Sequence, residues 1–114
     1  MSEHNEQAAL ISWFDIQIKS ERIFAIPNAA KRSVRLASYM KAEGMRSGVP
    51  DLFMPTPNAK YHGLFIEMKW KKNKLTEAQS EWADYLNSRG FMATACWSFA
   101  EAKEVIINYL KEQP

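Results

Sequence analysis

Charged residues stand in both apolar runs of residues 44–72, and this feature limits the available folds most strongly. The stretch DLFM begins with Asp51, and GLFIEMK contains Glu67 and Lys69. GLFIEM reads as a strand that is apolar on both faces, where an ionised carboxylate without a partner is very unfavourable. We therefore expect a sheet in which these three charged side chains lie together for a functional reason.

Hydrophobic periodicity and capping residues predict eight alternating elements of secondary structure. Ser2 is expected to cap the first helix, and Thr76 with Gln79 and Ser98 with Glu101 both fit a capping box. Helices are expected at 3–18, 31–43, 76–89 and 99–112, and strands at 22–27, 51–54, 63–70 and 91–98. The order α-β-α-β-β-α-β-α indicates an α/β fold, with a small mixed sheet flanked by helices.

Composition narrows the class of protein. The chain has 114 residues and is 46% hydrophobic, which suits a single domain over residues 1–114 with one core. Cys96 is the only cysteine, so an intrachain disulfide and a cysteine-rich zinc site are excluded. The polar N-terminus and the lack of a long apolar run predict a soluble, cytoplasmic protein without a membrane segment.

The spacing of the charged residues favours metal chemistry. Residues two apart in a strand share a face, so Glu67 and Lys69 point the same way, and strand pairing can bring Asp51 to them. Two converging carboxylates suit Mg²⁺ or Mn²⁺, and the lysine could then act on an attacking water or on phosphate charge. Ordinary turn chemistry at Asp51 and a solvated Glu67–Lys69 pair are the alternatives.

Three segments, in the order GVPDLFM, GLFIEMK and LTEAQSEW, resemble the VRR-NUC domain, a branch of the PD-(D/E)XK nuclease superfamily. The small stand-alone viral and bacterial members are the most similar, and the resemblance runs from Glu3 to Leu110. It implies a restriction-endonuclease-like core and a Mg²⁺ or Mn²⁺ cofactor. It also implies Asp51, Glu67 and the Met68 carbonyl as metal ligands, with Lys69 as the catalytic lysine.

Two further site residues follow from the resemblance, and each has a structural alternative. The family pattern of an acid four residues before a glutamine matches Glu3 and Gln7, with Glu6 as a second candidate. A negative charge at a helix N-terminus would equally explain Glu3. Gln79 matches a family glutamine near the active site, although the capping box with Thr76 is a sufficient reason for it as well.

Basic residues in two parts of the chain are expected to contact DNA phosphates. The segment AIPNAAKRS resembles the family's IPNGG-R segment, with Ala29 and Ala30 at the usual glycine positions. A solvated helix face is the alternative for this segment. Tryptophans are expected in the core or an interface rather than as stacking platforms, namely Trp70, Trp82 and Trp97. The expected phosphate contacts are Lys31, Arg32, Arg35, Lys71 and Lys72.

The combined expectation is a Mg²⁺- or Mn²⁺-dependent endonuclease acting on DNA in a bacterial or phage-infected host cell. Cutting both strands of a DNA structure needs two sites, which a two-fold homodimer supplies. Resemblance to the stand-alone members implies four-way Holliday junctions as the substrate. A non-catalytic DNA-binding module of the same fold, a nuclease for single-stranded or flapped DNA, and a small interaction protein without metal affinity are the alternatives.

Overall fold

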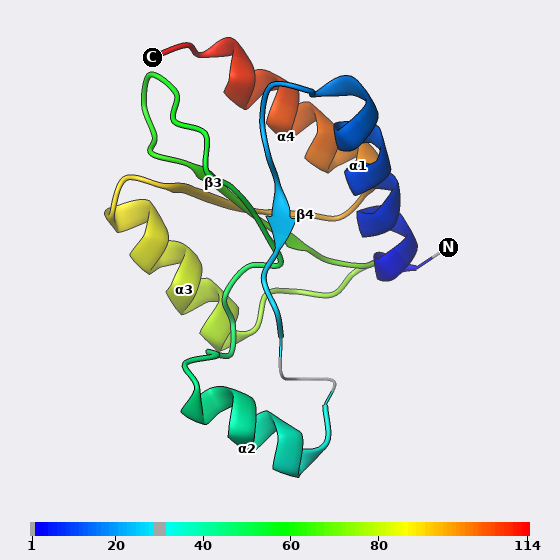
Figure 1. The fold of residues 1–114 in the computed structure, drawn as a ribbon, viewed down its shortest axis with the longest axis vertical. Coiled ribbons are helices and arrows are strands. Elements are labelled where there is room, and N and C mark those ends of the chain that lie inside the picture. The colour runs from blue at the N-terminus through cyan, green and yellow to red at the C-terminus, as the bar shows by residue number, and fades with distance from the viewer. Residues whose placement is uncertain (1, 29–31) are drawn as a thin grey trace.

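The computed structural model describes residues 2–28 and 32–114 and contains the predicted elements in the predicted order (Figure 1). The elements are α1 (Glu3–Gln17), β1 (Phe24–Ala25), α2 (Val34–Ala42), β2 (Leu52–Met54), β3 (Leu64–Met68), α3 (Glu77–Ser88), β4 (Met92–Cys96) and α4 (Phe99–Lys111). The α/β class is thereby confirmed.

The four strands form one sheet in the order β1-β2-β3-β4. β1 pairs with β2 and β2 with β3 in antiparallel fashion, whereas β4 runs parallel to β3 because α3 carries the chain back across the sheet. α1 and α4 lie together on one side of the sheet, and α3 lies on the other (Figure 1). The sheet is therefore covered on both faces in its central part, as the apolar composition of β3 predicts.

The main core lies between the sheet and the α1–α4 pair. Leu10 and Phe14 of α1 are buried there, as are Ile106 and Tyr109 of α4. From β3, three alternate residues face this core and are at most 1% exposed, namely Leu64, Ile66 and Met68. Because strand side chains alternate, Phe65 and Glu67 point to the opposite face, beneath α3.

Capping explains where most helices begin. The hydroxyl of Ser2 accepts from the Asn5 N–H, and the predicted capping box of Thr76 with Gln79 is present in both directions. The second predicted box is wrong in one half: the Ser98 hydroxyl accepts from the Glu101 N–H, but the Glu101 carboxylate accepts from the N–H of Trp97, at 3.3 Å. This side chain therefore reaches one residue further back than a capping box requires.

The second helix starts later than the sequence predicts. Its first residue is Val34 because the Ser33 hydroxyl accepts from the Leu36 N–H and fixes the N-cap there. α2 lies at one end of the molecule, beyond α3, and contributes no buried residue (Figure 1). The side chains of Val34 and Tyr39 are 86% and 67% exposed. α2 is thus an outlying helix with an uncovered apolar surface.

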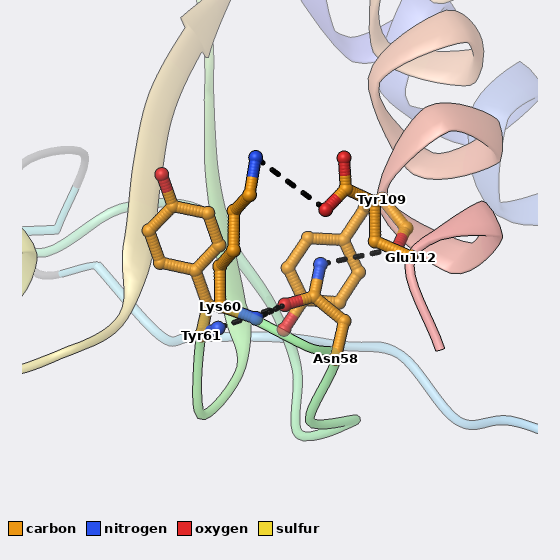
Figure 2. A network of polar contacts seen from close by, with 5 residues as sticks. All are labelled: Asn58, Lys60, Tyr61, Tyr109 and Glu112. Carbon is orange, nitrogen blue, oxygen red and sulfur yellow. Dashed lines mark hydrogen bonds and ion pairs between the residues drawn. The ribbon is translucent and has the colours of Figure 1, made fainter. Parts of the chain in front are cut away.

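The loop between β2 and β3 is fixed to the end of α4 by a polar network (Figure 2). The Asn58 amide donates to the carbonyl of Tyr109 at 3.1 Å, and its oxygen accepts from the backbone N–H groups of Lys60 and Tyr61. The Tyr61 and Tyr109 rings stack with centroids 6.3 Å apart. Lys60 also forms an ion pair with Glu112. These contacts hold the loop against the last turn of α4, where Asn58 adds a second donor to a carbonyl that also accepts from the Glu112 N–H.

Within the residues that the structure describes, no helix combines the length and the apolar character needed to cross a membrane.

Candidate active site

Strand pairing brings Asp51 and Glu67 together. Leu52 pairs with Ile66, and continuing this antiparallel register by one residue places Asp51 opposite Glu67. Asp51 directly precedes β2, and its Oδ2 accepts a hydrogen bond of 2.7 Å from the backbone N–H of Met68. This bond fixes the aspartate carboxylate beside β3 and orients the peptide units around Met68.

The charged side chains of β3 are buried under α3. Glu67 is 7% exposed and Lys69 is 8% exposed, so both have lost most of their contact with water. The backbone N–H of Lys69 donates to the carbonyl of Cys96 at 2.8 Å, which extends the pairing of β3 with β4 past its last strand residue. The lysine is therefore held just past the end of the central strand β3, two residues beyond the glutamate and on the same face.

Gln79 connects the two charged groups. Lys69 Nζ donates to Gln79 Oε1 at 3.1 Å, and Gln79 Nε2 donates to Glu67 Oε2 at 3.3 Å. The same Oε1 accepts from the backbone N–H of Thr76 at 2.9 Å, which closes the capping box. The two explanations of this glutamine are therefore not exclusive, since one side chain caps α3 and bridges the charged residues of β3.

The electrostatics of the cluster oppose a second negative charge. Burial raises the pKa of Glu67 from 4.5 to about 9, and the charge of Asp51 and a hydrogen bond between the two carboxyl groups add to this effect. Lys69 acts in the opposite direction and lowers the pKa of Glu67. One lysine thus does not balance the site, and a further cation would favour the ionised form of both acids.

The donor set fits a hard divalent cation. Asp51 and Glu67 supply carboxylate oxygens, and the Met68 carbonyl directly follows Glu67 on β3. Mg²⁺ is typically held by one or two carboxylates and retains several waters. In the described ranges 2–28 and 32–114, no group of three or more His, Cys, Asp or Glu side chains could hold a metal. Two carboxylates and one backbone carbonyl are therefore the ligands that this site can offer.

Comparison with known proteins agrees with this geometry. The family model for the VRR-NUC domain matches residues 1–100. The chain belongs to the VRR-NUC family. A solved structure described as a "VRR_NUC domain protein" is similar with a TM-score of 0.86 and 28% identity, over 99% of this chain and 91% of that chain. A comparison with curated protein sequences gave no match. A VRR-NUC domain is a nuclease-type domain, which indicates DNA as the partner and general dependence on a divalent metal.

The acids of α1 have different surroundings in this VRR-NUC domain. The charge of Glu3 contributes to the raised pKa of Glu67, so this residue acts electrostatically on the site. Glu6 does something else, because its Oε1 accepts from the backbone N–H of Phe99 at 3.3 Å, in the first turn of α4. Glu6 thus joins α1 to α4, and its role as a second site acid stays a prediction.

The basic residues that the sequence indicates as DNA contacts fall in two places. Arg35 is exposed on α2 and Arg32 is exposed just before it, whereas Lys31 lies outside the described residues. Lys71 and Lys72 are exposed in the turn that follows Lys69. The second group therefore lies next to the site along the chain, and the first belongs to the outlying helix.

A hollow of about 200 Å³ beside Glu67 was not expected from the sequence. Gln79 also lines this hollow. Small residues line it as well, Ala83 from α3 and Ala93 with Ala95 from β4. Since Ala93 pairs with Phe65 and Ala95 with Glu67, these alanines share the face of the acid. The small residues of MATAC are the signal in the sequence, because they leave space where larger strand residues would fill the layer under α3.

Proposed function

We propose that this VRR-NUC domain is a Mg²⁺- or Mn²⁺-dependent endonuclease that hydrolyses DNA phosphodiester bonds at Asp51, Glu67 and Lys69. The observation that carries the proposal is the Asp51–Glu67 pair, in which burial of Glu67 and the charge of Asp51 raise the pKa of Glu67 to about 9. A purely structural site would gain nothing from two acids that oppose each other's ionisation. A site that holds a divalent cation at phosphate uses one or two carboxylates, and the pair offers both.

Each residue has a separate role in the proposed chemistry. Asp51, Glu67 and the Met68 carbonyl would hold the ion, which supplies a water of lowered pKa and offsets charge on the phosphate when bound. Lys69 positions the attacking water or offsets the negative charge that develops on phosphorus. Gln79 aims the lysine, because its Oε1 accepts from Lys69 Nζ at 3.1 Å. Glu3 adds negative charge near the ligands.

We further propose a homodimer that acts on four-way junctions. Two helices offer complementary surfaces for a second copy: α2 is basic, with Arg35 and Lys41, and α3 is acidic, with Glu81 and Asp84. Both carry exposed apolar side chains, such as Tyr39 at 67% and Tyr85 at 51%. A two-fold dimer would provide two sites for a substrate of matching symmetry.

The experiment is a cleavage assay with labelled linear, flapped, single-stranded and four-way-junction DNAs, each with Mg²⁺, Mn²⁺ or a chelator. We expect metal-dependent, paired cuts near the centre of the junction, made by a dimer in light scattering. A monomer at micromolar concentration that cleaves junctions no better than linear duplex would contradict the dimer and junction parts. Absence of cleavage of every DNA would contradict the enzyme itself.

A further inference from the structure

The turn that follows Lys69 has an unusual backbone. The N–H of Asn73 donates to the carbonyl of Trp70 at 3.1 Å, which closes a four-residue turn. Its second residue, Lys71, has φ 53°, and among the described residues it is the only one other than glycine with a positive φ. Glycine is the residue that this conformation favours, because a Cβ atom is strained there. The presence of lysine instead of glycine at this position therefore suggests a function for its side chain.

Two contacts hold this turn in place. The indole N–H of Trp97 donates to the carbonyl of Asn73 at 2.8 Å, so the residue after β4 is tied directly to the turn. Trp97 is 36% exposed and so lies outside the core, which leaves the interface as the open part of the prediction for this residue. The ammonium of Lys71 lies 5.8 Å from the centre of the Trp70 ring. The turn is thus a fixed projection next to the proposed catalytic lysine, and not a loose loop.

The charges on this turn are not neutralised within the chain. Lys71, Lys72 and Lys74 are all exposed. In the part of the chain that the structure describes, none of them forms an ion pair with a carboxylate, since the ion pair found there joins Lys60 to Glu112. Three cations on a fixed turn beside a nuclease site are arranged to meet an extended polyanion.

We propose that residues 70–74 form a phosphate-binding subsite for the DNA backbone. Lys71 is held in a strained conformation to make this contact, and Trp97 is the residue that positions the turn. Strained residues persist where the surrounding structure fixes them and function requires them. The inference rests on the proposed function only in placing the bound phosphate beside the one that is hydrolysed. DNA binding itself can be measured without any cleavage.

The test uses Lys71→Gly with a fluorescein-labelled DNA duplex, in chelator and over a series of salt concentrations. The variant should melt at a higher temperature than the wild type, because glycine accepts the positive φ without strain. It should bind DNA more weakly, and the slope of log K against log salt should fall by about 0.9, as expected for one lost phosphate contact. Lys111→Gly, at the far end of α4, is the control that loses an equal charge and should keep the wild-type slope.

Trp97→Phe separates the positioning role from general stability. It keeps an aromatic ring but loses the N–H that donates to Asn73, so DNA binding should weaken although the lysines remain. Adding Trp97→Phe to Lys71→Gly should then change the slope little, because both act through the same turn. Independent, additive losses would remove Trp97 from the proposal.

A wild-type slope in Lys71→Gly, a lower melting temperature in that variant, or no binding of duplex by the wild type would each overturn the inference. These outcomes are distinguishable from failure of the proposed function. If the wild type cleaves no DNA but Lys71→Gly reduces the salt slope, the subsite stands without the nuclease. If cleavage is observed and the slope is unchanged, the nuclease stands without the subsite.

Discussion

Two polar clusters in this protein are built on opposite principles. The side-chain nitrogen of Asn58 donates to a backbone carbonyl, and its side-chain oxygen accepts from two backbone N–H groups (Figure 2). The neighbouring ion pair of Lys60 with Glu112 lies at the surface. At Asp51 and Glu67, two carboxyl groups lie side by side, and Glu67 is buried. The hydrogen bonds of the first arrangement come from a neutral amide and do not depend on ionisation, whereas the second arrangement opposes the ionisation of Glu67.

The difference does not lie in missing hydrogen bonds. Among the described residues, no buried side-chain nitrogen or oxygen lacks a hydrogen-bond partner, and the active site is included in this statement. Lys69, Gln79 and Glu67 form a continuous chain of such bonds. What the site lacks is a second cation to offset the ionised form of Glu67, because one lysine cannot balance two carboxylates, and a hydrogen bond cannot supply this charge. Opposed ionisation with complete hydrogen bonding is therefore the property that separates the Asp51–Glu67 cluster from the Asn58 cluster.

The largest effect is expected when a carboxylate of the site is neutralised. Asp51→Asn or Glu67→Gln should lower cleavage of the best DNA substrate by about 100-fold or more, because each removes a proposed metal ligand at nearly constant shape. Circular dichroism should show an unchanged fold. Glu104→Gln, an exposed acid on α4, is the matched control and should keep wild-type activity. Full activity in either site variant would remove that residue from the catalytic site.

A smaller loss is expected when the link between the charged groups is cut. Gln79→Glu keeps an oxygen that accepts from Thr76 and so keeps the cap, but it loses the amide that donates to Glu67. Cleavage should fall by about 10- to 100-fold, as for other residues that orient ligands. The melting temperature should stay close to that of the wild type. If the variant cleaves normally, Gln79 serves the helix cap alone.

Substitutions in the cluster around Asn58 should change the stability of the fold and leave the rate of DNA cleavage unchanged. Asn58→Ala removes one donor to the Tyr109 carbonyl and the oxygen that accepts from the N–H groups of Lys60 and Tyr61, which should lower the free energy of unfolding by about 1–3 kcal/mol. Lys60→Ala removes only an ion pair whose side chains are 66% and 44% exposed, and should change stability by less than about 0.5 kcal/mol. Denaturant titration measures both. The folded fraction of each variant should cleave DNA at the wild-type rate, and a catalytic defect would contradict the division into two clusters.

Much of this comparison follows from local sequence rules. The side-chain period of a strand predicts that Glu67 and Lys69 share a face, and a hairpin predicts that Asp51 meets them. Contacts between residues far apart in the sequence cannot be predicted by such local rules. The bond from Phe99 to Glu6 joins residues that are 93 positions apart, and neither residue signals it. Gln79 was ambiguous because a capping box explains it fully from neighbouring residues, while its contact with Glu67 depends on how α3 lies over the sheet.

The most gradual effect is the dependence of stability on pH without metal. The folded chain keeps the Glu67 proton up to about pH 9, whereas an unfolded chain releases it above about pH 4.5. The folded state therefore binds more protons in this window, and the contribution of Glu67 to stability falls as the pH rises from 4.5 to 9. In chelator, Glu67→Gln should remove this part of the decline. Parallel curves for the two proteins would contradict it.

The most direct test of the central claim, that Asp51 and Glu67 are placed for a divalent cation, is a thermal melt of the wild type and Glu67→Gln at pH 8, each with chelator and with Mn²⁺. A ligand that binds only the folded state raises its melting temperature. We predict that Glu67→Gln melts higher than the wild type in chelator, and that Mn²⁺ raises the melting temperature of the wild type but not of the variant. An unchanged wild type in Mn²⁺, or an equal rise in both proteins, would contradict the account.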